Sequence, residues 1–414
     1  MSSKRTLLLT HGYPPEKGGS YNYLHRIHKN LAEKWTVLTA RFPGDRAFDR
    51  KQLFKIKRSF IYTLLLLFDG RGGALFPLLK PLICPYVYIY QRTRYLRLIG
   101  HFLILIRSLL EIIIGRYDLV ICGHACMPIG LVGYLSRKIL RIPYIAFVYG
   151  EELTEIEYKG HRITKKLMRN VVISAERVVV CSSATGGRLL KLGVPQNRIK
   201  LVYPGVDIER FKPFKPGSEF LDKLGINGDK LMLSVGRLIE RKGFDTVLDS
   251  LPDIMRSVGP VKYIIAGNGP DRKRLELKVK ENGVESSVIF LDGVTDEELP
   301  ALYNACDLFV MPNRIGKQAG DVEGFGMVFL EASACGKPVI GGRSGGAVEA
   351  IEHSSSGYLV HPESKDEFIT AAVDILKNGK GTAYGANGLK RCRSQFTWKQ
   401  SAETMRSVLD SISI

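Results

Sequence analysis

Residues 5–41, RTLLLTHGYPPEKGGSYNYLHRIHKNLAEKWTVLTAR, contain a strand, a helix and a second strand in succession. The apolar run RTLLLTHG ends in a loop, and the run TVLTAR follows after the helix. Between the two runs, Tyr23, Ile27 and Leu31 lie near one face of an amphipathic helix. Such a unit predicts two parallel strands that are joined by a right-handed crossover helix.

Outward from this unit, strand-like runs alternate with helical patterns over the whole chain. The later runs are YDLVICGH, YIAFVYG and RVVVCSS in the first half, and LMLSVGR, KYIIAGNG, SVIFLDG, LFVMP and PVIGG in the second. Residues 204–226, which are rich in proline, glycine and charge, separate the halves. We therefore predict an α/β fold of two doubly wound, Rossmann-like domains facing each other across a cleft. The predicted segments are residues 1–206, residues 207–393 and a helix at 394–414 that packs back toward the first domain.

Composition excludes several classes of protein. With 45% hydrophobic and 24% charged residues among 414, the chain is typical of a globular protein. Its seven scattered cysteines indicate a reducing compartment rather than a disulfide framework. Cys122, His124 and Cys126 alternate along one predicted strand but lack a fourth ligand, so we expect no metal. The N-terminal residues are not apolar enough for a signal peptide, and we expect a cytoplasmic protein.

The net charge of +19 is concentrated in one part of the chain. Residues 51–116 hold eleven Lys or Arg against Asp69 and Glu111, a local charge of +9, beside the apolar runs FIYTLLLLF, PLICPYVYIY and HFLILIRSLLEIIIG. No apolar run reaches the roughly 18 residues of a spanning helix, so we expect this segment to face an anionic membrane surface. The alternative is an ordinary core helix or two with solvated arginines. We find no nucleic-acid-binding signature and expect no nucleic acid as a partner.

In open parallel sheets, ligands bind beyond the carboxyl ends of the strands, so the residues that follow strands are the candidates for a site. In SVGRLIERKG, Gly236 and Arg237 follow a strand, and Lys242 comes five positions later. Two cations beside a glycine that admits backbone approach suit a diphosphate. The alternative is that both cations are simply solvated.

A second candidate is EGFGMVFLE, in which Gly324 and Gly326 remove side-chain bulk where a helix begins. The backbone N–H groups there can face an anion with the helix dipole behind them. These groups belong to Phe325, Gly326, Met327 and Val328.

Two carboxylates flank this helix start. Glu331 lies about one turn into the helix, where a carboxylate would repel phosphate but accept hydrogen bonds from a ribose diol. Glu323 precedes the helix and can accept hydrogen bonds from the hydroxyls of a sugar attached to the phosphate. The alternative is a capped surface helix with incidental glutamates.

A third candidate is HGYPPEKGG, in which Gly18 and Gly19 open the first helix. A lone glycine pair is a weak signal, but placed opposite the other two candidates it would complete a phosphate clamp.

Several of these stretches together resemble one family nearly end to end. They are PPEKGG, VCSSATGGRLLKLGVPQNRIKLVYPGVDIERF, SVGRLIERKGFD, IIAGNGP, LDGVTDEELPALYNACDLFVMP and GDVEGFGMVFLEASACGKPVIGGRSGGAVEAI. The chain resembles the retaining GT-B glycosyltransferases of glycosyltransferase family 4, nearest the phosphatidylinositol mannosyltransferase branch. This resemblance implies a nucleotide-diphosphosugar donor held mainly by the C-terminal domain, an acceptor-side N-terminal domain, and transfer that retains the anomeric configuration.

The resemblance also implies roles for individual residues. Arg237 and Lys242 would bind the diphosphate, Glu331 the ribose, and Glu323 with the following amides the donor sugar. Val294, in the strand end LDGV, would offer backbone atoms to the base. No metal or other cofactor is implied, because cations and a helix end can neutralise the leaving diphosphate.

The chain departs from the family at one position. The family usually has a histidine in the motif HG.E, after a strand of the N-terminal domain, whereas FVYGEEL places Tyr149 there. Tyrosine can donate a hydrogen bond to a sugar hydroxyl but cannot act as an imidazole. His124, at the end of DLVICGH, is another candidate, although a lone histidine after a strand is more often structural.

We therefore expect a peripheral enzyme of the inner face of the cell membrane. It would move a hexose from a GDP- or UDP-sugar to a lipid-linked or membrane-presented glycan acceptor. The alternatives are a non-catalytic nucleotide-binding GT-B protein, which Tyr149 motivates, and a GT-B sugar-nucleotide epimerase, for which the basic apolar segment at residues 51–116 has no evident use.

Overall fold

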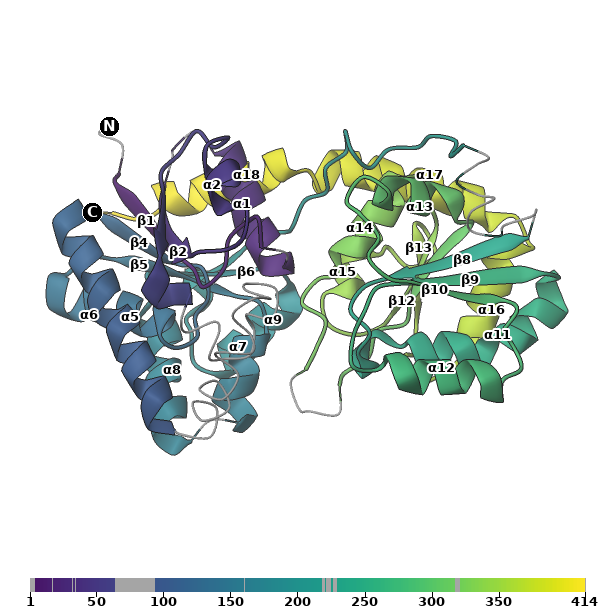
Figure 1. Cartoon of the computed structure of the whole chain (residues 1–414), viewed down its shortest axis with the longest axis horizontal. Helices are drawn as coiled ribbons and strands as arrows, with labels where there is room; N and C mark the ends of the chain where they lie inside the picture. Colours follow the sequence, from purple (N-terminus) through teal and green to yellow (C-terminus); the bar gives the residue numbers. More distant parts are fainter. Residues whose placement is uncertain are drawn as a thin grey trace. The chain divides into compact units, whose positions relative to one another are not determined.

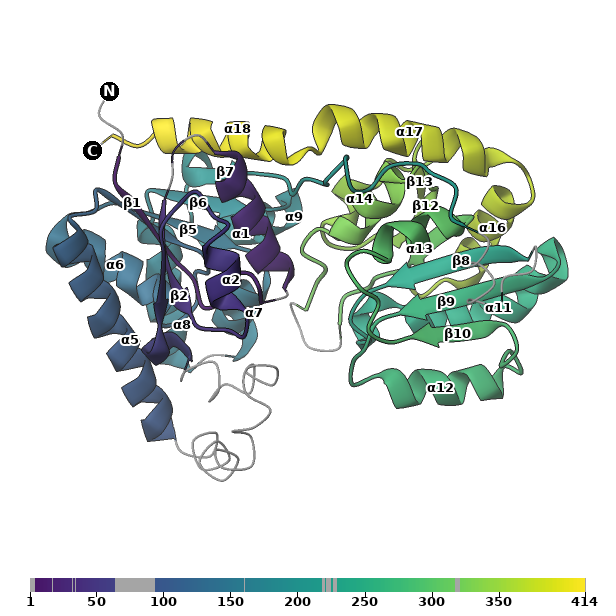
Figure 2. The same ribbon diagram turned by 45° about the horizontal axis from the view of Figure 1, so that its top comes forward.

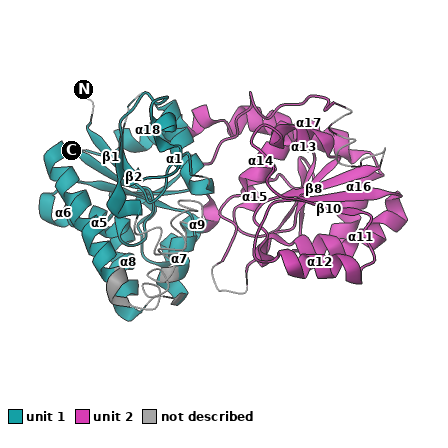
Figure 3. Ribbon diagram, in the orientation of Figure 1, with its two compact units in different colours: residues 1–181, 185–202, 402–414 teal, residues 182–184, 203–401 magenta. Residues whose placement is uncertain are grey.

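The computed structural model describes residues 4–413, apart from 17, 32, 34, 64–93, 160, 218–219, 221–224, 226–228 and 317–320. The chain forms two compact units, each built on its own parallel sheet (Figure 1, Figure 3). Unit 1 contains residues 1–181, 185–202 and 402–414, and unit 2 contains residues 182–184 and 203–401.

Unit 1 has a seven-stranded sheet in the order β3-β2-β1-β4-β5-β6-β7, and every neighbouring pair is parallel. The strands are β1 (Thr6–Leu9), β2 (Thr36–Ala40), β3 (Ile56–Ser59), β4 (Leu119–Cys122), β5 (Tyr144–Val148), β6 (Arg177–Val180) and β7 (Ile199–Leu201). β1, β4 and β5 are buried along their whole length, since helices cover both faces of the sheet.

The helices of unit 1 connect these strands as crossovers. They are α1 (Gly19–Asn30), α2 (Asp45–Asp49), α5 (Arg94–Gly115), α6 (Ile129–Leu140), α7 (Glu151–Thr154), the π-helical turn η1 (Glu155–Lys159), α8 (Arg162–Ser174), α9 (Ser183–Lys191) and the short turn η2 (Gln196–Arg198). In α1, Tyr23, Leu24 and Ile27 are buried against the sheet, which is the face that its sequence pattern predicts.

Unit 2 has a six-stranded parallel sheet in the order β10-β9-β8-β11-β12-β13. Its strands are β8 (Lys230–Val235), β9 (Val261–Ala266), β10 (Val288–Leu291), β11 (Leu308–Met311), β12 (Val339–Gly342) and β13 (Gly357–Val360). Its helices are η3 (Glu240–Lys242), α11 (Phe244–Val258), α12 (Arg272–Glu281), α13 (Leu299–Ala305), α14 (Met327–Ala334), α15 (Ala347–Ala350), α16 (Lys365–Leu376) and α17 (Lys380–Gln395). The prediction of an α/β fold with two doubly wound sheets is therefore confirmed.

The last helix, α18 (Trp398–Asp410), begins in unit 2 and ends in unit 1. In unit 1, Lys4 Nζ donates hydrogen bonds to the carbonyl oxygens of Leu409 (3.0 Å) and Ile412 (2.6 Å). Arg177, the first residue of β6, donates hydrogen bonds to Oγ and to the carbonyl oxygen of Ser411. The C-terminal residues are thus tied to the amino ends of β1 and β6.

The order of each sheet reverses at one point, between β1 and β4 in unit 1 and between β8 and β11 in unit 2. At such a point two neighbouring loops leave in opposite directions and open a crevice at the carboxyl ends of the strands. In unit 1 the residues at this edge include His11 and His124, and in unit 2 they include Gly236 and Arg237.

Helix α5 lies on the outside of unit 1 (Figure 2) and is longer than the sequence pattern indicated. The expectation that no segment reaches spanning length was wrong. The helix continues through Arg107 and Glu111, and its part Leu98–Gly115 is long and apolar enough to cross a membrane, with a mean hydropathy of 2.0. However, Ile104 and Ile112 are fully buried in the core of unit 1, so one face of α5 is part of the domain.

Candidate active site

The loop after β8 begins the candidate site in unit 2. Gly236 has a φ of 154°, and a β-carbon on its neighbour Gly267 would lie 2.0 Å from the Gly236 carbonyl oxygen. Glycine is therefore required where the loops after β8 and β9 meet. Arg237 is exposed, and no residue in the described part of the chain forms an ion pair or hydrogen bond with its guanidinium. A cation at the switch point thus remains available for a ligand.

Lys242 lies in η3 and is already paired with Glu323. Its Nζ is 2.6 Å from Glu323 Oε2, and Arg241 Nη1 is 2.6 Å from the same oxygen. Arg241 Nε also lies 3.0 Å from Asp321 Oδ1. Burial by itself would raise the pKa of Glu323, but the charges of Lys242 and Arg241 outweigh burial and lower the pKa to about 2. Glu323 is therefore ionised at neutral pH.

The turn that carries Glu323 leads into α14. Gly326 precedes the helix with a φ of 85°, and no side chain caps the N-terminus. The first turn of α14, which contains Met327 and Val328, therefore presents backbone N–H groups at the positive end of the helix dipole. Such an end attracts anions. The side chain of Phe325 serves another purpose, because it is 3% exposed and packs in the core.

Two glycines of the next loop hold this turn in place. Gly346 donates its N–H to the Glu323 carbonyl oxygen at 3.0 Å. A β-carbon on Gly345 would lie 2.3 Å from that same oxygen, and one on Gly346 would lie 2.3 Å from the Gly324 carbonyl oxygen. The loop after β12 therefore packs directly against the Glu323 turn, with no room for side chains.

Glu331 lies in α14 and accepts a hydrogen bond from the Tyr303 hydroxyl at 2.7 Å. Burial, together with the negative charge of Glu331, raises the pKa of Tyr303 well above its usual value, so Tyr303 remains a donor. This contact orients the Glu331 carboxylate. Nothing in the sequence pointed to Tyr303, because it lies 28 positions earlier, on α13.

The loop after β10 contains Val294. It follows Gly293, which has a φ of 70°, and precedes a capped turn in which Thr295 N–H donates to Glu298 Oε2 at 2.9 Å. Arg272 binds Asp292 at 3.1 Å and stacks over Phe290, with 4.1 Å from its Cζ to the ring centroid. This loop is therefore supported on both sides of Val294.

The candidate residues of unit 1 gather at the carboxyl ends of β1, β4 and β5. The ring centroid of His124 is 5.2 Å from that of Tyr149 and 5.9 Å from that of His11, and His124 Nε2 is 3.1 Å from Ser20 Oγ. His11 also follows a strand, but the sequence analysis did not single it out. The structure thus brings His124 and Tyr149 together.

The hydroxyl oxygen of Tyr149 is buried, and no described residue is its hydrogen-bond partner. Burial raises the pKa of Tyr149 well above its usual value, so the side chain is a neutral phenol. The turn that presents it is fixed by Glu152, whose Oε2 accepts the N–H groups of Tyr149 (3.0 Å) and Gly150 (3.2 Å). Arg188 donates to the Gly150 carbonyl oxygen at 3.2 Å and is paired with Glu157 at 2.8 Å.

Gly18 precedes α1 and Gly19 is its first residue, and the structure gives Gly18 a packing role. A β-carbon on Gly18 would lie 2.8 Å from the ring of Tyr21, and one on Gly12 would lie 2.4 Å from it. The position of the Tyr21 ring therefore requires glycine at positions 12 and 18.

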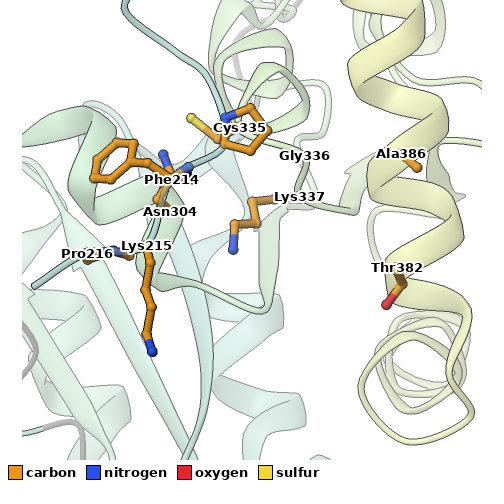
Figure 4. A pocket seen from close by; sticks show the side chains of 10 residues that line it. Phe214, Lys215, Pro216, Asn304, Cys335, Gly336, Lys337, Thr382 and Ala386 are labelled. Atoms are coloured by element: carbon orange, nitrogen blue, oxygen red, sulfur yellow. Dashed lines mark hydrogen bonds between the residues drawn. The ribbon is translucent and has the colours of Figure 1, made fainter. Parts of the chain in front are cut away.

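A shallow cavity of about 600 Å³ lies elsewhere in unit 2 (Figure 4). Its lining includes Lys215, Asn304, Cys335, Lys337 and Thr382. Asn304 and Lys337 precede β11 and β12, so the cavity is at the amino ends of the strands, opposite to the predicted site residues. No group of three or more His, Cys, Asp or Glu side chains in the described residues could hold a metal ion.

Two family models match the chain. Residues 17–210 match the model described as "Glycosyltransferase Family 4", and residues 218–391 match "Glycosyl transferases group 1". Among curated proteins, the chain is 29% identical over 412 residues to a GDP-mannose-dependent alpha-(1-6)-phosphatidylinositol monomannoside mannosyltransferase of Mycobacterium tuberculosis, covering 98% of each chain. It is 27% identical to a D-inositol 3-phosphate glycosyltransferase of Saccharomonospora viridis, covering 71% of this chain and 70% of that one.

Solved structures match over nearly the full length. The structure of Anabaena HepE in complex with UDP and glucose has a TM-score of 0.74 at 21% identity, covering 99% of this chain and 100% of that one. Sucrose-phosphate synthase from Thermosynechococcus elongatus has a TM-score of 0.75 at 19% identity, covering 98% of each chain. At these identities the matches establish the fold.

Proposed function

The chain belongs to glycosyltransferase family 4, has the GT-B fold and transfers a sugar from a nucleotide-sugar donor; from this premise we propose that it transfers mannose from GDP-mannose to a lipid-linked acceptor at a membrane surface. GDP-mannose is favoured because a relative named for that donor aligns with this chain over 98% of the length of each. The acceptor is favoured by the exposed apolar face of α5.

The observation that carries the donor part is that unit 2 has both an exposed cation, Arg237, in the loop after β8 and an uncapped helix N-terminus, that of α14, after β11. Arg237 has no acidic partner among the described residues, and α14 has no side-chain cap. Together they offer a free cation and free N–H groups to a diphosphate. Glu331, oriented by Tyr303, would accept the ribose hydroxyls, and Glu323 would accept a hydroxyl of the sugar.

In the proposed reaction, the bond between the sugar C1 and the diphosphate oxygen breaks while the acceptor oxygen bonds to C1 on the same face. The proton of the acceptor hydroxyl passes to the leaving diphosphate, whose negative charge Arg237, Lys242 and the helix dipole stabilise. Tyr149, as a neutral phenol, would donate a hydrogen bond to a sugar hydroxyl rather than act as a base.

The membrane part of the proposal rests on α5, whose outward face is apolar. This face contains Leu98 (62% exposed), Ile99 (53%), Phe102 (60%), Leu103 (43%), Ile106 (40%), Leu110 (49%), Ile113 (54%) and Ile114 (77%). Its inward face packs Ile104, Ser108 and Ile112 into unit 1. An apolar face this large on one helix marks an interaction surface. Because the other face is committed to the domain, we propose that α5 lies along the membrane rather than across it.

Charge near α5 favours an anionic lipid surface as the occupant. Lys57 on β3 and Arg107 both bind Glu111, which joins β3 to α5. On the loop before β3, Lys51 and Lys55 are exposed and flank Leu53, which is 90% exposed. Basic residues beside protruding apolar side chains suit anionic head groups above an acyl boundary.

The proposal is tested by two measurements on the purified chain. Thermal-shift screening with GDP-mannose, UDP-glucose and UDP-N-acetylglucosamine should show the largest stabilisation with GDP-mannose. Labelled GDP-mannose with membrane lipid should then yield labelled product that extracts into organic solvent. Stabilisation by a UDP-sugar alone would overturn the choice of donor. Donor binding without any transfer to lipid would favour the alternative of a non-catalytic protein, which the replacement of the family's usual histidine by Tyr149 suggests.

A further inference from the structure

Both cations that bind Glu323 bind the same oxygen. Arg241 Nη1 and Lys242 Nζ each lie 2.6 Å from Oε2, while none of the described residues donates a hydrogen bond to Oε1. The Glu323 side chain is only 11% exposed. A carboxylate buried to this degree needs at least one paired cation to stay ionised. Oε2 is thus the anchored oxygen, and Oε1 is the one that a ligand can use.

The two cations differ in their other contacts. Arg241 has a second anchor in Asp321, 3.0 Å from its Nε. Lys242 has no second acidic partner in the described part of the chain. Its stem faces the loop after β8, because a β-carbon on Gly236 would lie 3.9 Å from Lys242 Cε. Of the two, Lys242 is therefore the cation that can turn toward a phosphate beside Arg237.

We propose that Arg241 is a positioning residue that keeps Glu323 anchored when Lys242 leaves it for the diphosphate of the donor. The inference rests on the proposed diphosphate site at Arg237 and Lys242. When that site is empty, Arg241 and Lys242 balance the charges of Asp321 and Glu323. The incoming diphosphate and Glu323 then compete for Lys242, and Arg241 is the cation that remains on Oε2.

This competition makes an unusual prediction for the binding of a nucleoside diphosphate without a sugar. Glu323→Gln removes the competitor, so GDP should bind more tightly, by about threefold to tenfold, although transfer is lost. Arg241→Gln leaves Lys242 as the sole counter-charge of a buried carboxylate, so GDP should bind more weakly by a similar factor. In the double variant, Arg241→Gln should no longer lower GDP affinity, because the glutamine at position 323 is neutral and needs no cation.

The experiment is a double-mutant cycle measured by calorimetry, with GDP and, in parallel, UDP as the probes. The full-length wild type, Arg241→Gln, Glu323→Gln and the double variant are titrated, after circular dichroism and thermal melts establish that each is folded. Arg314→Gln is the matched control. Its side chain is 15% exposed against 14% for Arg241, and its ion pair is with Asp245 rather than with Glu323. We expect GDP affinity to be unchanged in this control.

Two results would overturn the inference. If Arg241→Gln lowers GDP affinity by the same factor whether or not Glu323→Gln is present, Arg241 binds the diphosphate directly. GDP affinity that does not rise in Glu323→Gln would mean that Glu323 does not compete for Lys242. Failure of the underlying diphosphate site is distinguishable, because GDP affinity would then be unchanged in Lys242→Gln and in Arg237→Ala.

Discussion

Tyr149 carries a hydroxyl group that the fold buries without a partner among the described residues. A buried hydroxyl that makes no hydrogen bond destabilises a protein by roughly 1 to 3 kcal/mol. We therefore expect Tyr149→Phe to be at least as stable as the wild type and to transfer sugar at least about tenfold more slowly, since the hydroxyl is retained for a ligand contact. Thermal melts and turnover measured on the same preparation test both expectations.

Two outcomes would count against this role for Tyr149. Unchanged turnover would remove the hydroxyl from the site. Lower stability would mean that the hydroxyl has a structural partner. His124→Ala is the companion variant, because the two rings are 5.2 Å apart and a loss in Tyr149→Phe alone assigns the effect to the phenol.

Glu152 makes stability depend on pH in a specific window. Burial raises its pKa to about 7, above the ordinary value of 4.5 that the unfolded chain has. A group whose pKa is raised on folding favours the folded state at low pH, and this advantage is lost as the pH rises from about 4.5 to about 7. Relative to Glu152→Gln, the wild type should lose on the order of 3 kcal/mol of unfolding free energy over this range.

Urea unfolding of both proteins at pH 4.5, 6 and 8 measures this difference. Glu323, with a pKa of about 2, has the opposite sign, and its contribution is lost only as the pH falls below about 4.5. The comparison with Glu152→Gln cancels the Glu323 contribution, because both proteins contain Glu323. A difference that does not change with pH would show that folding does not raise the pKa of Glu152.

At the scale of single residues, sequence reasoning proposes candidates among residues that follow strands, but it does not show which side chains meet in the folded chain. Glu323 and Lys242 stand in recognisable turns at the carboxyl ends of β11 and β8. Arg241, adjacent to Lys242, could not be assigned a role, because its partners Asp321 and Glu323 lie about eighty positions away. Only the meeting of the loops after β8 and β11 creates this cluster.

The loop after β12 is the element that supports the Glu323 turn, and its fit can be tested with one methyl group. Gly345 has a φ of 58°, and a β-carbon there would lie 2.3 Å from the Glu323 carbonyl oxygen. Gly345→Ala should therefore displace this turn and weaken donor binding by about tenfold or more, in addition to the roughly 1 kcal/mol that a left-handed conformation costs. Calorimetry with GDP-mannose and thermal melts measure the two effects.

Gly379→Ala is the matched control for this prediction. Gly379 also has a left-handed backbone, with a φ of 81°, but a β-carbon there meets nothing within 4 Å. Both variants should lose similar stability from backbone strain, and only Gly345→Ala should lose donor affinity. Equal donor affinity in the two variants would show that the turn tolerates displacement.

Elements with alternating strand and helix patterns were predicted well, because parallel sheets bury short apolar runs that stand out between helices. Helix α5 shows where this reasoning fails. The apolar run HFLILIRSLLEIIIG begins at His101, whereas the helix begins at Arg94 and its apolar part at Leu98. Within the helix, Arg107 and Glu111 pair with each other across one turn at 3.1 Å. Whether an apolar side chain of α5 points inward or outward depends on tertiary packing, which the sequence pattern does not reveal.

At the scale of the whole molecule, each unit closes its own core. The core of unit 1 includes Ile104 and Ile112 of α5, and that of unit 2 includes Phe244 and Leu248 of α11. Apolar residues left outside these cores are concentrated on α5. Residues 51–116, part of which lies outside the described residues, carry a charge of +9 out of the net +19. Among the described residues of this region, the exposed basic side chains are Lys51, Lys55 and Arg116, so unit 1 carries both the apolar face of α5 and exposed positive charge.

This coincidence predicts binding to anionic membranes through α5. The chain should co-sediment with vesicles that contain phosphatidylglycerol at low salt and bind vesicles of phosphatidylcholine alone far less, because the basic residues need anionic head groups. Binding should weaken as salt screens these charges. Replacing Phe102 and Ile113 with Ser should lower vesicle affinity roughly tenfold or more, since each side chain would lose its burial in the acyl boundary.

The control replaces Leu190 and Leu277 with Ser, two residues that are also exposed (44% and 59%) but lie on α9 and α12. If both double variants bind vesicles like the wild type, α5 does not contact the membrane. If Phe102 and Ile113 instead control a dimer in solution, the face is an interface between two copies, and a water-soluble acceptor becomes the better proposal.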